Sequence, residues 1–145
     1  MGTIRRILLI VDGSEPGYRA ARQAGLLAKQ CGAALDVVYA GDRIKEIRGI
    51  FHAHTDLRVS YAVGHNHRQQ EIFSHTASLL PDGIMPEWHV KNDDIAEAIL
   101  QTAVECQSDM IIMGSRSLGI LEGILSGSVI RKVFRGAVVP VLLVK

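Results

Sequence analysis

Five short apolar runs alternate with segments of helical periodicity along the chain. The runs cover residues 7–11, 35–40, 85–90, 110–113 and 138–144. Runs that are apolar at successive positions are typical of strands covered on both faces by helices. A strand, helix, strand order favours right-handed parallel crossovers. The pattern therefore predicts a doubly wound α/β domain with a parallel sheet, whose ligands bind at the carboxyl ends of the strands.

Polar and glycine residues predict where three helices begin and end. Ser14 is a good N-cap for the first helix, and Gly32 is a stop signal at its end. Asp93 or Asp94 is expected to cap a later helix with an apolar side. The last helix is predicted over residues 128–135.

The segment between residues 42 and 83 has a weaker pattern. Apolar positions at helical spacing in residues 44–51 and 72–80 predict a short helix and a long one. Between them, residues 64–66 (Gly-His-Asn) are a candidate break, and residues 81–83 (Pro-Asp-Gly) predict a turn.

Two prolines indicate which strands lie at the edges of the sheet. Pro140 lies inside the last apolar run and Pro86 near the start of the third. Proline has no backbone N–H to donate to a strand ladder, so it is confined to edge strands, strand starts or bulges. We therefore expect the last strand to be an edge strand, and the third to begin near an edge.

Composition narrows the class of protein. The chain has 145 residues, 48% of them hydrophobic and 21% charged, with a net charge of +1. This predicts one globular domain over residues 1–145 and argues against a nucleic-acid-binding protein, which usually has a basic excess. No apolar run approaches the roughly 20 residues of a membrane-spanning helix, and nothing directs export. We expect a cytoplasmic protein with no membrane partner.

A loop rich in glycine and serine follows the fourth strand. Residues 114–129 contain four glycines, four serines and Arg116 ahead of a helix. Glycines let backbone amides approach an anion, and a helix start offers unpaired N–H groups, so the loop could hold phosphates. It could equally consist of turns and a helix cap. The P-loop and G-x-G-x-x-G signatures are both missing from the sequence.

These residues resemble the universal stress protein family over nearly the whole chain. Nucleotide-binding members have Gly-x-x-Gly, nine residues, then Gly-Ser or Gly-Thr in this loop. Here Gly114 and the pair Gly127 and Ser128 match, with Ser117 in place of the second glycine. The other matching stretches are residues 7–14, which end in Val-Asp-Gly-Ser, and residues 109–114, 127–129 and 140–144.

The resemblance implies a five-stranded parallel sheet of order 3-2-1-4-5 that binds ATP, with Mg²⁺ as a candidate companion ion. Asp12 would face the adenine and ribose, and Ala40 would form backbone hydrogen bonds to the adenine edge. Met113 and Gly114 would lie along the ribose. For Asp12 the alternative is a turn or cap with Ser14.

The same resemblance places the phosphates at the start of the last helix. Gly127, Ser128 and Val129 would supply amides, and Ser128 also a hydroxyl. Ser117 is the departure from the family pattern. If its backbone needs a positive φ, serine costs roughly 1–2 kcal/mol, and its side chain could crowd a phosphate or donate to it.

Three functions are compatible with this pattern. The first is an ATP-binding regulatory module of the stress response. The second is a slow ATPase, although Glu122 is the one acid in the loop and has no recognised role there. The third is an interaction protein that binds no nucleotide. In each case the apolar edge strand 138–144 predicts a homodimer, which the resemblance also implies.

The histidines and cysteines predict no metal site. The pairs His52 and His54, and His65 and His67, have no cysteine or carboxylate at a recognisable ligand spacing. Cys31 and Cys106 each end an apolar helical stripe, so we expect both to be buried, unreactive thiols.

Overall fold

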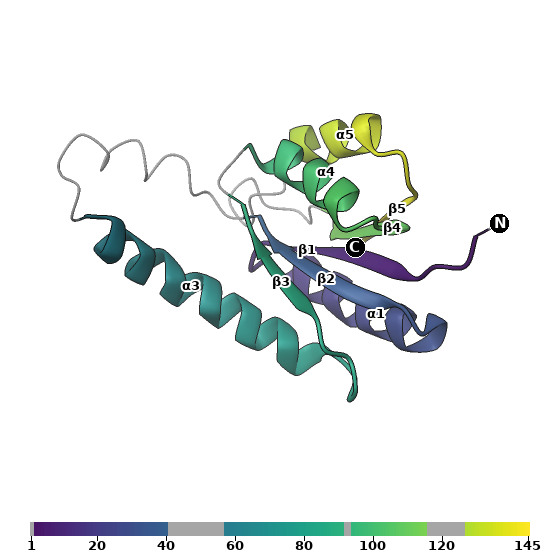
Figure 1. Cartoon of the computed structure of the whole chain (residues 1–145), viewed down its shortest axis with the longest axis horizontal. Coiled ribbons are helices and arrows are strands. Elements are labelled where there is room, and N and C mark those ends of the chain that lie inside the picture. Colours follow the sequence, from purple (N-terminus) through teal and green to yellow (C-terminus); the bar gives the residue numbers. More distant parts are fainter. Residues whose placement is uncertain (1, 41–56, 92–93, 116–126) are drawn as a thin grey trace.

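The computed structural model describes residues 2–40, 57–91, 94–115 and 127–145, and for residues 57–66 the backbone alone. Its strands form one parallel sheet in the order β3-β2-β1-β4-β5 (Figure 1), which confirms the expected fold class and strand order. The strands are β1 (Arg6–Val11), β2 (Ala34–Tyr39), β3 (Glu87–Val90), β4 (Met110–Gly114) and β5 (Val141–Val144).

Helices cover both faces of the sheet. Figure 1 shows α1 (Glu15–Cys31) and α3 (Leu57–Leu79) on one side, and α4 (Ile95–Glu105) and α5 (Gly127–Gly136) on the other. The layers are therefore helix, sheet, helix, and the middle strands are apolar because both of their faces are covered.

The first helix is fixed at both ends by the residues expected from the sequence. The Ser14 hydroxyl accepts a hydrogen bond from the Gly17 amide, and Gly32 ends the helix with a left-handed φ of 65°. Small residues form the stripe that packs on the sheet. These are Ala20, Ala21, Ala24 and Ala28, all fully buried. Small side chains let α1 lie close to the strands.

The core has two halves, one on each side of β1. Ile7, Leu9 and Val11 pack with the alanines of α1, while Leu8 and Ile10 pack beneath α4 and α5. All five side chains have no exposed surface. Burial of such side chains contributes about 1.5–3 kcal/mol each relative to leaving them exposed. The central strand thus anchors both layers of helices.

One predicted break is wrong. The helix α3 continues without interruption from Leu57 to Leu79, through residues 64–66. A glycine inside a helix costs about 1 kcal/mol, which the packing of Ile72, Phe73 and Leu79 against the core can offset. The predicted short helix over residues 44–51 lies outside the described residues.

Both proline-marked strands lie at sheet edges, as predicted, but both are shorter than the apolar runs. β5 begins at Val141 rather than Val138, and β3 at Glu87 rather than Met85. The Pro140 carbonyl accepts from the Ile111 amide at 2.9 Å, but its nitrogen has no hydrogen to donate. Regular pairing therefore starts after each proline.

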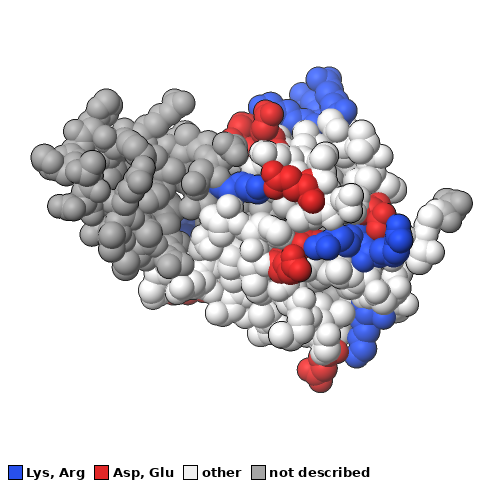
Figure 2. Space-filling model, in the orientation of Figure 1, with Lys and Arg blue, Asp and Glu red and all other residues white. Residues whose placement is uncertain are grey.

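The surface shows no single-sign stripe on the face visible in Figure 2. Acidic and basic side chains lie next to one another there, in agreement with the net charge of +1. Within the described part of the chain, no helix is long and apolar enough to cross a membrane.

A buried carboxylate interrupts the apolar face beneath α4. The Asp36 side chain, in the middle of β2, has no exposed surface. Arg6 donates to it from Nε at 2.9 Å and from a terminal nitrogen at 3.0 Å, and His89 Nε2 lies 2.8 Å from its Oδ1. Burial alone would raise the pKa of Asp36, but the hydrogen bonds from Arg6 and His89 prevail and hold it below the ordinary value of 3.8.

This lowered pKa predicts an acid-sensitive contribution to stability. The contribution is complete above the unfolded-state pKa of about 3.9 and is lost as the pH falls through the lower folded-state value. We expect Asp36→Asn to lower stability at neutral pH by about 1–3 kcal/mol and to flatten the acid loss. Thermal melts from about pH 7 to pH 2 measure both effects. The exposed Asp82→Asn is the control, and an acid profile unchanged by Asp36→Asn would contradict the account.

Candidate functional site

The candidate site lies where the inner strands end together. Val11 pairs with Tyr39, and two residues earlier Leu9 pairs with Ile112, so β1, β2 and β4 reach the same edge of the sheet. Asp12 and Ala40 follow directly after β1 and β2, and Gly114 is the last residue of β4. We call this region the carboxyl edge, and it is where open parallel sheets bind ligands.

Asp12 is buried at the carboxyl edge and forms a turn with Ser14. Its Oδ1 accepts from the Ser14 amide at 3.0 Å and from the Ser14 hydroxyl at 2.5 Å. The side chain is 3% exposed. The turn that was the alternative reading of Asp12 is therefore present. It involves one of two carboxylate oxygens, and a carboxylate has about four acceptor positions, so the turn and a ligand contact are compatible.

Ala40 can offer a ligand one backbone group. Its amide donates to the Val11 carbonyl at 2.8 Å, as a continuation of the sheet ladder. The Ala40 carbonyl is an acceptor at the end of β2, of the kind that an exocyclic adenine amine could donate to. Met113 is fully buried in the core beneath α4 and α5, so its contribution at a ribose would come from its backbone.

The end of β4 lies directly against the first turn of α1. A Cβ built on Gly114 would lie 2.5 Å from the Pro16 carbonyl carbon and 2.6 Å from the Gly17 amide nitrogen. A Cβ on Gly17 would lie 2.7 Å from Asp12 Oδ1. Two glycines thus bring α1, β4 and the Asp12 turn together. This packing accounts for Gly114 without any nucleotide.

The remaining expected residues lie at the start of α5. Gly127 and Ser128 are exposed and Val129 is half-buried. A Cβ on Gly127 would meet no atom of the described residues within 4 Å. The described part of α5 begins at Gly127. Ser117 lies outside the described residues.

The two cysteines differ from each other, and neither is buried as predicted. Cys31 is exposed rather than buried, because it is the last residue of α1 and lies beyond the helix's contact with the sheet. Cys106 is half-buried after α4. Burial and the nearby Asp36 carboxylate raise the pKa of its thiol to about 11. A thiol with a raised pKa is protonated at neutral pH, so these surroundings do not favour a reactive thiolate at Cys106.

Of the two histidine pairs of the middle segment, the structure describes the side chain of His67 alone, and it does not lie at the site. His67 is exposed and pairs with Glu71 at 3.1 Å on the surface of α3. His52 and His54 lie outside the described residues, as does the side chain of His65. Sequence reasoning instead missed the cluster around Asp36. The available signal was a lone carboxylate inside the apolar run of residues 35–40.

Comparison with known proteins gives a consistent result. The model of the universal stress protein family matches residues 3–145. A Thermus aquaticus protein, "Universal stress protein in QAH/OAS sulfhydrylase 3'region", is 34% identical over 143 residues, which cover 97% of this chain and 98% of that protein.

Solved structures share the fold. The universal stress protein of Archaeoglobus fulgidus in complex with dAMP has a TM-score of 0.64 at 23% identity, covering 99% of this chain and 100% of its own. A universal stress protein in complex with cAMP has a TM-score of 0.62 at 22% identity, covering 99% and 98%.

The contact between Gly114 and α1 predicts a large effect of one methyl group. Gly114→Ala would force the α1 backbone away from β4, and we expect a loss of about 1–3 kcal/mol in the free energy of unfolding. Gly127→Ala, whose Cβ would meet no atom of the described residues within 4 Å, is the matched control and should change this free energy by less than about 1 kcal/mol. Urea unfolding of both variants measures the difference. Equal effects of the two substitutions would show that the close approach is not a constraint.

Proposed function

The chain belongs to the universal stress protein family, and from that premise we propose that it binds an adenine nucleotide, ATP, at the carboxyl edge. The observation that supports the proposal most is the meeting of Asp12, Ala40 and Gly114 at the ends of three neighbouring strands. Two family members with the same fold form complexes with dAMP and cAMP, which supports the adenine part of the proposal.

The groups at the carboxyl edge fit the chemistry of adenosine. The adenine exocyclic amine is a donor, and the Ala40 carbonyl is an acceptor in a position next to β1. The ribose hydroxyls are donors as well, and the Asp12 carboxylate has acceptor capacity beyond its turn with Ser14. Gly114 has no side chain to stand between the strand end and a sugar.

The triphosphate of ATP would lie toward the start of α5. The first amides of this helix, at Gly127, Ser128 and Val129, would donate to phosphate oxygens, and the helix dipole favours negative charge there. Mg²⁺ would accompany ATP, coordinated chiefly by the phosphate oxygens. Ser117 lies in the sequence between β4 and α5. Its hydroxyl would either donate to a phosphate oxygen or crowd the phosphate.

We infer a regulatory binding module rather than a fast enzyme. Hydrolysis needs a group that orients water at the γ-phosphate. Among the described residues of the carboxyl edge, the carboxylate is that of Asp12. In the proposed pose Asp12 contacts the adenosine and not the γ-phosphate, so it would not orient the attacking water. Nucleotide occupancy would then act through the protein surface, in a protein we place in the cytoplasm.

A homodimer through the last strand is the second part of the proposal. β5 is an edge strand, and Leu142 on it remains 37% exposed. Just before it, Val138 is 91% exposed. An edge strand with apolar side chains is usually covered by another chain. A second copy placed edge to edge would continue the sheet.

Nucleotide binding can be tested by calorimetry on protein that has been unfolded, freed of small molecules and refolded. We expect saturable binding of ATP with Mg²⁺. Asp12→Asn keeps an acceptor for Ser14 but loses the charge, so its affinity for ATP should fall at least about tenfold. The surface variant Asp82→Asn should bind like the wild type.

The outcomes separate the alternatives. If the wild type binds both ATP and AMP, and Asp12→Asn lowers the affinity for both by a similar factor, the proposed position of Asp12 at the adenosine is supported. If millimolar ATP produces neither heat of binding nor a shift in Tm, the supported function is the alternative, an interaction protein that binds no nucleotide. Release of ADP over hours would indicate the slow ATPase.

The proposed dimer predicts a mass in solution of twice the 15.8 kDa of one chain. Leu142→Lys would place a charge at the centre of the interface, and we expect it to give monomer at micromolar concentration. Val104→Lys is the control, since Val104 is 69% exposed on α4, away from β5. Light scattering coupled to size exclusion measures the masses. A monomeric wild type would refute the dimer and leave the nucleotide proposal standing.

A further inference from the structure

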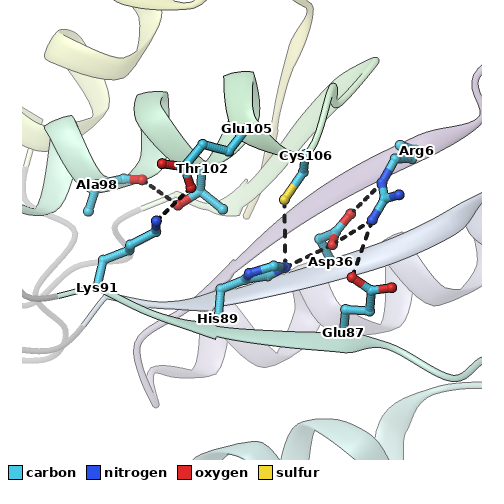
Figure 3. A network of polar contacts seen from close by, with 9 residues as sticks. All are labelled: Arg6, Asp36, Glu87, His89, Lys91, Ala98, Thr102, Glu105 and Cys106. Carbon is cyan, nitrogen blue, oxygen red and sulfur yellow. Dashed lines mark hydrogen bonds and ion pairs between the residues drawn. The ribbon is translucent and has the colours of Figure 1, made fainter.

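A second cluster of polar side chains lies beneath the end of α4, near the amino ends of β1 and β4. We call it the amino-edge cluster, and Figure 3 shows its arrangement. Asp36 comes from β2, His89 from β3 and Cys106 from the residue after α4. Their donor atoms, a carboxylate oxygen, an imidazole nitrogen and a sulfur, all lie within 4.8 Å of one another. The register pairs Asp36 with Leu8 and His89 with Val38, so both lie within the sheet and are distinct from the residues of the carboxyl edge, which follow the strand ends.

The three donor atoms lie close together around His89 Nε2. His89 Nε2 lies 2.8 Å from Asp36 Oδ1 and 3.6 Å from Cys106 Sγ. A single Nε2 hydrogen can be directed at one of these atoms but not at both. A cation placed among them would accept electron pairs from all three at once.

We propose that the amino-edge cluster is a binding site for a borderline-soft divalent cation, Zn²⁺. Thiolate, imidazole and carboxylate are the zinc ligands of proteins, whereas Mg²⁺ and Ca²⁺ require sets of oxygen ligands. Zn–S and Zn–N bonds of about 2.3 and 2.0–2.1 Å set sulfur and nitrogen about 3.5 Å apart in a tetrahedral site. The Cys106–His89 separation of 3.6 Å fits this geometry before any adjustment.

The charges around the cluster fit a divalent ion. With Cys106 as a thiolate, the negative groups are this thiolate and the carboxylates of Asp36 and Glu87. Arg6 supplies one positive charge, with one of its terminal nitrogens 3.4 Å from Glu87. The net charge of these four groups is −2, which one Zn²⁺ would neutralise. Metal binding would release the thiol proton, as it must for a cysteine ligand.

Arg6 acts as a positioning residue for the carboxylate. It donates to both oxygens of Asp36, at 2.9 and 3.0 Å, and so fixes the plane of the carboxylate. Outer contacts of this kind orient metal ligands. Oδ1 retains acceptor capacity for a metal bond, and the 2.8 Å contact to His89 would open by about half an ångström to admit the ion.

The cluster is reachable from solvent. The His89 side chain is 25% exposed, while Asp36 is fully buried. Three protein ligands leave one coordination position, which water or an external ligand would take. The ion would tie the edge strand β3 to the end of α4, so its direct effect would be on stability at this edge of the sheet.

The test is a titration of reduced, EDTA-treated full-length protein with Co²⁺, the spectroscopic substitute for Zn²⁺. We expect one equivalent to produce the thiolate-to-cobalt charge-transfer band and the visible bands of tetrahedral Co²⁺, which Zn²⁺ then abolishes. Cys106→Ser should lose the charge-transfer band, and His89→Gln should lose the tetrahedral spectrum. Cys31→Ser and His67→Gln, at exposed positions, are the matched controls and should retain both.

A second measurement keeps the test independent of folding defects. Zn²⁺ should raise the Tm of the wild type and of Cys31→Ser, but not that of Cys106→Ser, whose far-ultraviolet circular dichroism should match the wild type. A wild type without the charge-transfer band would overturn the proposal. A band that survives Cys106→Ser, or that disappears in Cys31→Ser, would do so as well. Cys106→Ser should leave ATP binding unchanged, so this result is separate from the proposed nucleotide function.

Discussion

The close backbone contact between β4 and α1 sets the geometry of the carboxyl edge. Gly114 and Gly17 allow it, because a Cβ at either position would lie within 2.7 Å of backbone or of the Asp12 carboxylate. The contact holds the start of α1 against the strand end and fixes the Asp12 turn beside it. Two of the groups that we assign to adenosine, the Asp12 carboxylate and the end of β4, are positioned by this packing. The edge is therefore formed by the apolar fold itself, before any ligand binds.

The carboxyl edge and the amino-edge cluster present different polar groups, which are held in different ways. At the carboxyl edge the strands stop together and leave a carbonyl, a carboxylate and a helix start. At the amino edge, Asp36 is buried inside the apolar sheet and is held by Arg6 and His89. A buried charge requires such partners, because desolvation without them costs several kcal/mol. The polar residues at both ends are thus exceptions to a continuous apolar pattern.

Most of the fold follows from local signals in the sequence. The apolar runs gave the strands, and Ser14 and Gly32 gave the ends of α1, because capping depends on neighbouring residues alone. The strand order, by contrast, came from the family resemblance. The break predicted at residues 64–66 failed because packing elsewhere in α3 outweighed one glycine. Asp36, His89 and Cys106 are 53 and 17 residues apart in sequence, and no spacing rule joins them. Only the sheet register brings them together.

The central claim is that the carboxyl edge binds an adenine nucleotide, and amide chemical shifts measured by NMR during an ATP titration test it most directly. Our account predicts saturable shifts at Asp12, Ala40, Gly114 and the first residues of α5, with little change at the amino-edge residues Asp36 and His89. Saturable shifts confined to another surface, or unchanged spectra at millimolar ATP, would contradict it.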